Sequence, residues 1–410
     1  MSPSGRSRRK RCGSWTWHLG AIALVSLGAG AVSGCGATTS PASSGQVVPA
    51  LRTSIATSLE TSAGSWVTVP MGHLDQPLNT FWQLFFRPTG AKSWSNRASA
   101  LAVATNGGLV LATDGGKALV VGIRTTNYLQ FSPLIVTSNA REWTPATPIS
   151  ALVDTTDALA RNARGDSLAL VGQAKAAQVL ASPGGLSGWR TLVTKTQLSN
   201  SRSGRDCGVL SLTAVGYFGD EELVGTSCSR TGTVGVFAAP IGGKRPVSWE
   251  LVGPRLARSF GRSRSDVLGL EASANGFCAL VKVEKGSAPA LVAACTTTGA
   301  TRWTVSPALP VTGFDDVVSF GPTGGLGLFT LVSGSAGRPE LAVFRGSSLR
   351  WEIVPPPPPG TVTVAFLPGG KLDAFVVDDT VCTDWQLASG TGRWVKVQRM
   401  QVAIQFGSSS

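Results

Sequence analysis

The sequence predicts an all-β fold made of repeated units, from its composition and from the spacing of its tryptophans. The chain has 50 Gly and 24 Pro but only 14% charged residues, and no long segment places apolar residues at helical spacing. Seven tryptophans each follow a short apolar run: Trp94, Trp143, Trp189, Trp249, Trp303, Trp351 and Trp394. Their intervals of 49, 46, 60, 54, 48 and 43 residues average 50, a period typical of β-propeller blades. We therefore predict a seven-bladed β-propeller, with six or eight blades as the alternatives.

The stretch Pro339–Pro355 shows the repeated pattern most clearly. Leu341–Phe344 is a short apolar run, a Gly-Ser-Ser turn follows, and Trp351–Val354 forms a second run that ends at Pro355. This order suits two neighbouring strands, the second lying at the outer edge of a blade and leading into a loop. Four short strands between successive tryptophans fit one blade. We predict that Trp351 packs between neighbouring blades.

The two ends of the repeated region are predicted to complete one blade together. From Ser65 onward, Trp66–Pro70 resembles the outer strand of the later units, so the N-terminal piece is interpreted as the outer part of a blade only. Beyond Trp394, Val395–Val397 and Gln401–Phe406 still alternate, although no further unit follows. Inner strands from the C-terminus would then join N-terminal outer strands and remove exposed edges. The propeller domain is predicted to span residues 65–410.

The N-terminus has the order of a targeting signal. Five Lys and Arg residues lie between Arg6 and Arg11, an apolar segment covers Ala21–Val32, and Val32-Ser33-Gly34-Cys35 follows. The apolar segment is shorter than the ~20 residues that a membrane-spanning helix needs. An ordinary secretory signal is the alternative to a lipoprotein signal. Residues 35–64, rich in Ser, Thr, Ala and Gly, are predicted to form a flexible tether.

The tetrapeptide ending at Cys35 resembles the lipobox of bacterial lipoproteins. That resemblance implies removal of residues 1–34 as a signal peptide and a diacylglycerol thioether on the sulfur of Cys35. More than one acyl chain gives stable membrane attachment, so we expect an extracytoplasmic protein on the outer leaflet of the cell membrane. The net charge of +13 includes five positive charges in residues 1–34, which leaves +8 after cleavage.

Five cysteines besides Cys35 remain after cleavage: Cys207, Cys228, Cys278, Cys295 and Cys382. A hairpin with its turn after residue 286 would place Cys278 opposite Cys295, and one with its turn after residue 217 would place Cys207 opposite Cys228. Directly opposed antiparallel positions bring Cα atoms to ~4.5–5.5 Å, within disulfide range. We predict both disulfides in an exported protein, with five buried thiols as the alternative. Cys382 is interpreted as a core residue.

Few residues are suited to catalysis. His18 lies in the predicted signal, and His73 lacks a serine elbow or metal-binding spacing around it, so we interpret it as a loop residue. Tyr217 falls in a predicted turn on the face opposite the usual substrate mouth of a propeller. The adjacent acids Asp220, Glu221 and Glu222 are interpreted as solvated turn residues. The sequence predicts no catalytic residue, no metal and no cofactor.

Arginines gather in two predicted connections between consecutive blades. Arg202 and Arg205 follow Trp189, and a second group follows Trp249: Arg255, Arg258, Arg262 and Arg264. Such connections emerge on the same face of a propeller, so they are candidates for an anion-binding surface. An anionic cell-envelope polymer or an acidic protein is the expected partner, and solvated loop charge is the alternative. Nucleic acid is not expected, because export removes the opportunity to meet it.

The repeated strands behind a lipobox resemble the seven-bladed propeller lipoproteins of GC-rich Gram-positive bacteria, and more distantly sialidase-type and WD40-type propellers. The resemblance covers residues 65–410 and is architectural, since the Asp-box and the Trp-Asp dipeptide of those two propeller types are missing. It implies a non-enzymatic binding or scaffold protein at the cell envelope. A sialidase-like carbohydrate-active hydrolase or lyase is the alternative, and the question of enzymatic activity stays open.

Replacing the predicted lipidation site tests the membrane anchor. We expect Cys35→Ala to move the chain from the membrane fraction to the soluble fraction, because the acyl chains that hold it would be missing. Fractionation with immunoblotting measures the change, and Cys12→Ala in the predicted signal is the control. Continued membrane retention of Cys35→Ala without bound lipid would refute the anchor.

Overall fold

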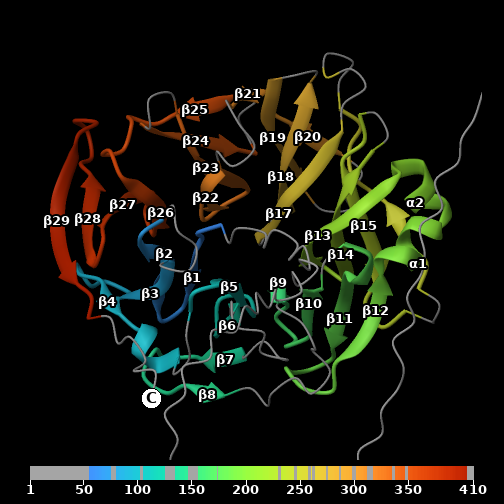
Figure 1. Cartoon of the computed structure of the whole chain (residues 1–410), viewed down its shortest axis with the longest axis horizontal. Helices are drawn as coiled ribbons and strands as arrows, with labels where there is room; N and C mark the ends of the chain where they lie inside the picture. The colour runs from blue at the N-terminus through green and yellow to red at the C-terminus, as the bar shows by residue number, and fades with distance from the viewer. Residues whose placement is uncertain are drawn as a thin grey trace, which may run out of the picture. The chain divides into compact units, whose positions relative to one another are not determined.

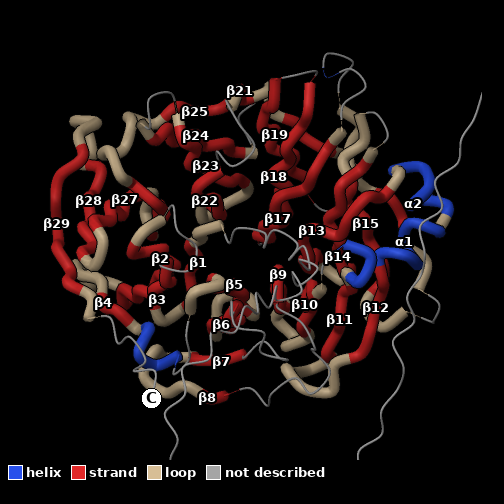
Figure 2. The backbone as a smooth tube through the Cα atoms, viewed as in Figure 1, coloured by secondary structure: helices blue, strands red, loops and turns tan. Residues whose placement is uncertain are grey.

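The computed structural model describes residues 55–403, except for 75–79, 102–104, 125–133, 146–155, 173, 230–231, 244–246, 257–259, 261–263, 274–275, 286–287, 298–301, 312–316, 335–337 and 347–349. The predicted signal, Cys35 and most of the predicted tether lie outside these residues. Strands dominate the described part (Figure 2). Two short α-helices of the described part, α1 (Lys195–Asn200) and α2 (Arg202–Cys207), lie between strands β12 and β13, and two 3₁₀ helices cover Ala98–Leu101 and Ala174–Ala176.

The strands follow one another as antiparallel meanders of four. The first comprises β1 (Ser58–Thr61), β2 (Gly64–Gly72), β3 (Thr80–Pro88) and β4 (Ser95–Asn96). The second comprises β5 (Gly108–Thr113), β6 (Leu119–Arg124), β7 (Leu134–Thr137) and β8 (Thr144–Pro145). The third comprises β9 (Thr156–Arg161), β10 (Ser167–Val171), β11 (Gln178–Ser182) and β12 (Arg190–Thr194).

The fourth meander comprises β13 (Val209–Phe218), β14 (Glu221–Cys228), β15 (Gly235–Pro240) and β16 (Glu250–Leu251). The fifth comprises β17 (Ser265–Ser273), β18 (Gly276–Lys285), β19 (Ala288–Thr297) and β20 (Trp303–Val305), with β21 (Leu309–Pro310) also paired to β19. The sixth comprises β22 (Val317–Pro322), β23 (Gly327–Ser333), β24 (Pro339–Arg345) and β25 (Trp351–Ile353). The seventh comprises β26 (Thr361–Leu367), β27 (Lys371–Asp378), β28 (Val381–Leu387) and β29 (Trp394–Gln401).

These meanders stand around a common axis, as a β-propeller does (Figure 1). The innermost strands contact one another in the order β1, β5, β9, β13, β17, β22 and β26, and β26 contacts β2 and β1 again. The fourth and fifth meanders share one nine-stranded sheet, because Ser227 and Cys228 of β14 pair with β17. The predicted count of seven blades stays a prediction, since it depends on counting that sheet as two.

Apolar side chains fill the junctions between consecutive meanders. The described residues form seven hydrophobic clusters, and each draws its members from two neighbouring meanders. The cluster between the sixth and seventh meanders, for example, packs Phe329 and Leu341 against Val364 and Phe366. Both faces of each interior sheet are therefore buried, which explains why the central strands read as continuous apolar runs in the sequence.

Each of the spaced tryptophans is either the first residue of a fourth strand or the residue directly before it, in keeping with the sequence prediction. Each of the seven packs into the cluster shared with the preceding meander. Three indole nitrogens also donate a hydrogen bond to a backbone carbonyl just after the preceding fourth strand. These bonds join Trp303 to Val252 at 2.8 Å, Trp351 to Pro307 at 2.9 Å, and Trp394 to Pro355 at 3.0 Å.

The closure of the ring differs from the prediction. Each sheet consists of consecutive strands, so β1–β4 form a complete meander of their own and β26–β29 form another among the described residues. The first and seventh meanders therefore meet by packing, and their described residues share no sheet; residues 404–406 of the predicted closing strand lie outside the described part. Trp66, interpreted as part of an outer strand, lies in the second strand and is fully buried. The predicted boundary at Ser65 falls inside the first meander, which begins at Ser58.

A cluster of buried polar side chains lies where the first and seventh meanders meet. Arg87 of β3 forms an ion pair with Asp373 of β27, with Nη1 and Oδ2 separated by 2.6 Å. The same Oδ2 accepts the indole N–H of Trp94 at 2.9 Å, and Oδ1 accepts the amide of Gln386 at 2.9 Å. Asp373 is completely buried. A buried carboxylate with three donors is well compensated, but loss of one charge leaves the other without its partner.

Gly64 permits the close approach of β2 to β3 at this junction. Its φ of +149° lies outside the range that other residues adopt easily. A Cβ atom on Gly64 would lie 2.1 Å from the carbonyl oxygen of Arg87. Glycine at this position therefore keeps the Arg87 backbone, and with it the ion pair to Asp373, in place.

Neutralising Asp373 tests the contribution of this ion pair. We expect Asp373→Asn to lower the free energy of unfolding by about 3 kcal/mol, because the Arg87 charge stays buried without its counter-charge. Glu352→Gln is the matched control, since the Arg345–Glu352 pair at 3.2 Å is about half exposed on both sides, and its loss should cost less than about 0.5 kcal/mol. Urea unfolding measures both changes, and equal effects would contradict a structural role for the buried pair.

Asp384 of β28 lies beside the Arg87–Asp373 ion pair and is also completely buried. Neither of its carboxyl oxygens has a hydrogen-bond partner among the described residues. Burial and, after it, the nearby Asp373 carboxylate raise the pKa of Asp384 to about 8, although the Arg87 guanidinium lowers it. The folded chain therefore holds a proton on Asp384 that the unfolded chain loses near pH 4.

The stability of the chain should accordingly fall as the pH rises from about 4 to 8. Over this range the native state binds more protons at Asp384 than the unfolded state, which lowers the unfolding free energy by about 1 kcal/mol per pH unit. Asp384→Asn cannot ionise, so its unfolding free energy should show a flatter profile. Urea midpoints at pH 5, 6.5 and 8 measure the difference, and parallel profiles for the two proteins would contradict the raised pKa.

Candidate functional site

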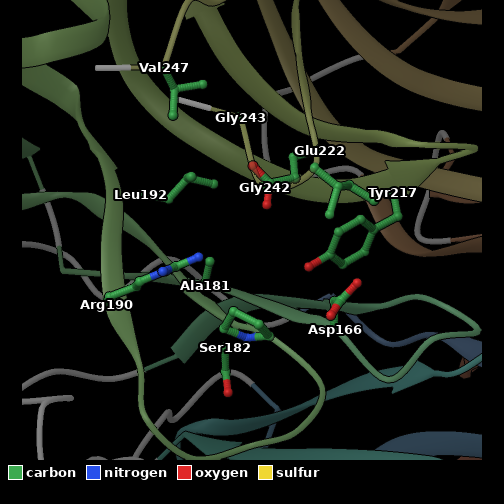
Figure 3. Close-up of a pocket in the computed structure, with 12 residues that line it drawn as sticks. Asp166, Ala181, Ser182, Arg190, Leu192, Tyr217, Glu222, Gly242, Gly243 and Val247 are labelled. Atoms are coloured by element: carbon green, nitrogen blue, oxygen red, sulfur yellow. The ribbon is translucent and has the colours of Figure 1, made fainter. Parts of the chain in front are cut away.

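A polar pocket lies between the third and fourth meanders (Figure 3). The pocket has a volume of about 80 Å³. Its walls come from β11, β12, β13 and β14, from the β9–β10 and β11–β12 turns, and from the connection between β15 and β16. Four side chains that can carry charge line it: Asp166, Arg190, Tyr217 and Glu222. Apolar contacts come from Leu192, Ile241 and Val247.

The Asp166 carboxylate is held by the turn between β9 and β10 and by the neighbouring turn between β11 and β12. Its Oδ2 accepts the side-chain amide of Asn162 at 2.9 Å, and its Oδ1 accepts the backbone N–H of Gly184 at 2.8 Å. Asn162 in turn accepts the backbone N–H groups of Arg164 and Asp166. The local sequence therefore positions this carboxylate before any ligand arrives.

Tyr217 and Glu222 come from the hairpin of β13 and β14, in which they are directly paired. Both are buried, with exposed fractions of 7% and 6%. Burial raises the pKa of Tyr217, and the nearby Glu222 and Asp166 carboxylates raise it further. The phenol therefore stays protonated across the physiological range and serves as a hydrogen-bond donor.

Arg190 supplies the positive charge of the pocket. It is the first residue of β12, directly after Trp189, and it is exposed. Its guanidinium and the Tyr217 hydroxyl point toward the centre of the pocket from opposite sides, with Asp166 below Tyr217 (Figure 3). The pocket thus presents carboxylate acceptors and two kinds of donor to one small volume. That combination suits a ligand whose groups both donate and accept hydrogen bonds.

A second cavity, of about 180 Å³, lies on the axis of the propeller. Segments of β5, β9, β13, β17 and β22 line it together with residues 55, 57, 58 and 59. Most of its lining is apolar. Within it, Arg124 Nη2 and Asp157 Oδ1 form an ion pair at 2.9 Å.

The arginines predicted to bind anions lie in separate surroundings. Arg202 and Arg205 are exposed on α2, where Arg205 donates to the Asn200 carbonyl. Arg255 is exposed, and Arg264 forms an ion pair with Asp266 at 3.1 Å. Arg258 and Arg262 lie outside the described residues. Arg205 and Arg264 thus interact with groups close to them in the sequence, and the anion-binding surface stays a prediction.

Both predicted disulfides are present. Cys278 and Cys295 are directly opposed in β18 and β19, with Cα atoms 4.0 Å apart. Cys207 and Cys228 are also bonded, with Cα atoms 5.1 Å apart, but their arrangement differs from the prediction. Two bulges in β13 shift the register so that Val209 pairs with Cys228, and Cys207 ends α2. Cys382 is buried in the junction of the first and seventh meanders, where burial raises the pKa of its thiol.

The sequence interpretation missed the polar pocket. It assigned Glu222 to a solvated turn, whereas the turn comprises Gly219 and Asp220, and Glu222 is buried in β14. It placed Tyr217 in the turn, whereas Tyr217 belongs to β13. Alternate residues such as Tyr217, Gly219 and Glu221 describe only the β13–β14 hairpin. They could not show which residues of β12 and of the β9–β10 turn lie beside this hairpin, because those residues belong to another meander. His73 is exposed in a loop, as predicted.

In the part of the chain that the structure describes, no group of three or more His, Cys, Asp and Glu side chains could hold a metal ion. No helix in that part of the chain is long and apolar enough to cross a membrane.

Comparison with known proteins identifies the fold and no family. No protein-family model and no curated protein matches the sequence. The BP39L lectin from Burkholderia pseudomallei is similar in structure, with a TM-score of 0.51 and 14% identity over 86% of this chain and 99% of that chain. A putative 6-phosphogluconolactonase from Bacteroides uniformis has a TM-score of 0.51 and 11% identity over 86% and 97%. A protein from Lactobacillus plantarum has a TM-score of 0.51 and 14% identity over 82% and 96%.

Proposed function

We propose that this chain is a binding propeller of the cell envelope, anchored through Cys35 to the outer leaflet of the membrane, and that its polar pocket binds a neutral carbohydrate. The observation that carries the ligand class is the convergence of Asp166, Arg190, Tyr217 and Glu222 in one small volume. Sugar hydroxyls both donate and accept hydrogen bonds, which matches carboxylate acceptors beside guanidinium and phenol donors.

The charge of the pocket favours a neutral sugar over an acidic one. Two carboxylates face one guanidinium, so an anionic sugar would meet a net negative charge. The apolar side chains of Leu192, Ile241 and Val247 offer contact to the C–H face of a sugar ring. The volume of about 80 Å³ accommodates one edge of a single sugar ring. We therefore expect the pocket to bind the terminal sugar of a longer glycan. One of the similar solved structures is named a lectin, but at 14% identity that similarity speaks for the fold alone.

A carbohydrate-active enzyme is the second candidate, because Tyr217 has two carboxylates beside it. A tyrosine nucleophile must lose its proton during the reaction. Burial and the neighbouring carboxylates instead raise the pKa of Tyr217, which disfavours the phenolate. The geometry therefore supports binding over nucleophilic catalysis at this residue.

Substitutions in the pocket test the proposal. We expect the full chain in nonionic detergent to bind neutral glycans on an array. Tyr217→Phe should weaken binding by about tenfold, because one hydrogen bond is lost. Arg190→Ala should weaken binding by ~10- to 100-fold, because a charge-assisted hydrogen bond is lost. Asp220→Asn is the matched control, since Asp220 is exposed on the same hairpin, pairs with Arg164 and does not line the pocket.

The same proteins separate binding from catalysis. Calorimetric titration with the best array glycan gives the affinities, and fluorogenic glycosides report turnover. Unchanged affinity in both pocket variants, with unfolding temperatures equal to that of the parent chain, would refute the pocket as the binding site. Turnover by the parent chain that Glu222→Gln abolishes would establish the enzyme instead.

A further inference from the structure

The cavity on the propeller axis has one carboxyl group with an unusual environment. Glu271 lies on β17, the innermost strand of the fifth meander, and lines the cavity. It pairs across the ladder with Cys278, which is disulfide-bonded to Cys295. A bulge in β17 between Val267 and Gly269 shifts the register just before this position. Glu271 therefore lies beside two strands, β18 and β19, that a disulfide joins.

The other charged groups of the cavity neutralise each other. Arg124 and Asp157 form their ion pair at 2.9 Å, and their side chains are 3% and 8% exposed. Thr57, Ser58 and Thr213 also line the cavity with uncharged polar side chains. The remaining wall is largely apolar, with leucines from four strands and the ring of Phe320, which packs directly on Gly269.

Glu271, unlike Arg124 and Asp157, forms no ion pair among the described residues. No hydrogen bond or ion pair of its side chain occurs among the described residues, although the residue is partly accessible through the cavity. Desolvation raises the pKa of Glu271 to about 8, and no neighbouring charge contributes. A carboxyl group with no ion pair of its own in a largely apolar cavity is a candidate for a binding site.

We propose that the axial cavity binds a small organic cation, a primary ammonium or amidinium group on an apolar body, with Glu271 as its counter-charge. The site is separate from the polar pocket and does not depend on the function proposed there. Hydrogen bonds between an ionised donor and a carboxylate are roughly twice as strong as neutral ones. An N–H cation therefore complements Glu271 better than an alcohol does, and a carboxylate ligand would be repelled.

The size of the cavity limits the ligand. A cavity of about 150 Å³ with apolar walls can hold benzene, so about 180 Å³ leaves room for one ring or a short chain plus the charged head. Leu109, Leu159 and Leu270 would contact the apolar body. Benzylamine and n-butylamine have this size and chemistry, and benzyl alcohol and butyrate are comparators of matched shape.

Binding of the amine should be coupled to ionisation of Glu271. The empty site is mostly protonated at pH 7, so a bound cation displaces close to one proton into the buffer. Amine affinity should consequently rise by about tenfold per pH unit between pH 6 and 8 and level off above pH 8, as long as the amine remains protonated. A neutral ligand would show neither effect.

The experiment is isothermal titration of the full chain in nonionic detergent at pH 7, with benzylamine in two buffers of different ionisation enthalpy. We expect one saturable site, release of close to one proton per amine, and at least tenfold weaker binding of benzyl alcohol. Glu271→Gln should lose at least tenfold in amine affinity and release no proton. Glu340→Gln is the matched control, because Glu340 is exposed on β24, and it should bind as the parent chain does.

A second variant keeps the test decisive if Glu271→Gln folds poorly. Leu111→Trp, on β5, would fill the cavity and should abolish amine binding while leaving the glutamate in place. Circular dichroism and the unfolding temperature confirm folding of each variant. The proposal is overturned if the parent chain shows no saturable amine binding, if benzyl alcohol binds as tightly as benzylamine, or if folded Glu271→Gln or Leu111→Trp binds benzylamine as the parent chain does.

Discussion

The structure depends on apolar packing between consecutive meanders, and the tryptophan at the start of each fourth strand is its most regular member. A four-stranded meander has two apolar faces and cannot bury both alone, so each must find a neighbour on either side. The indole reaches the cluster shared with the preceding meander, and in Trp303, Trp351 and Trp394 its N–H also satisfies a carbonyl of that meander. The same side chain thus excludes water and sets the distance between sheets. This explains why a single tryptophan recurs while the loops around it vary in length.

The junction of the first and seventh meanders needs more than this packing, because in the part of the chain that the structure describes neither a disulfide nor a shared strand joins them. Trp94 packs there as its counterparts do elsewhere, but its indole donates to the Asp373 carboxylate and not to a backbone carbonyl. Arg87 and Gln386 complete the partners of that carboxylate. Gln398 of β29 adds hydrogen bonds to the backbone N–H and carbonyl of Trp94. Directional polar contacts specify which two meanders meet, a task that non-directional apolar packing performs less well.

Both candidate sites lie where meanders meet, for the same geometric reason. Side chains from different meanders converge only at the junctions and on the axis, so a ligand can touch several of them only there. The polar pocket uses two adjacent meanders and the turns at one of their ends. The axial cavity uses the innermost strands of six meanders and places Glu271 among leucines. The two sites therefore differ in polarity, which suits a hydroxylated ligand in one and an apolar cation in the other.

The sequence alone determined the all-β class, the tryptophan period, the packing role of Trp351 and the pairing of the four bonded cysteines. These features depend on local composition and on spacing along the chain. The strand period and the blade period then predict where each residue lies within a blade. Only the tertiary structure decided how the ring closes. A blade completed by strands from both chain ends and two complete blades packed face to face have the same alternating pattern in the sequence. It alone also brought Arg190 and Asp166 to Tyr217, and Arg87 to Asp373 across 286 residues. Such contacts depend on the angle between neighbouring sheets. That angle cannot be predicted from the residue pattern within a single meander.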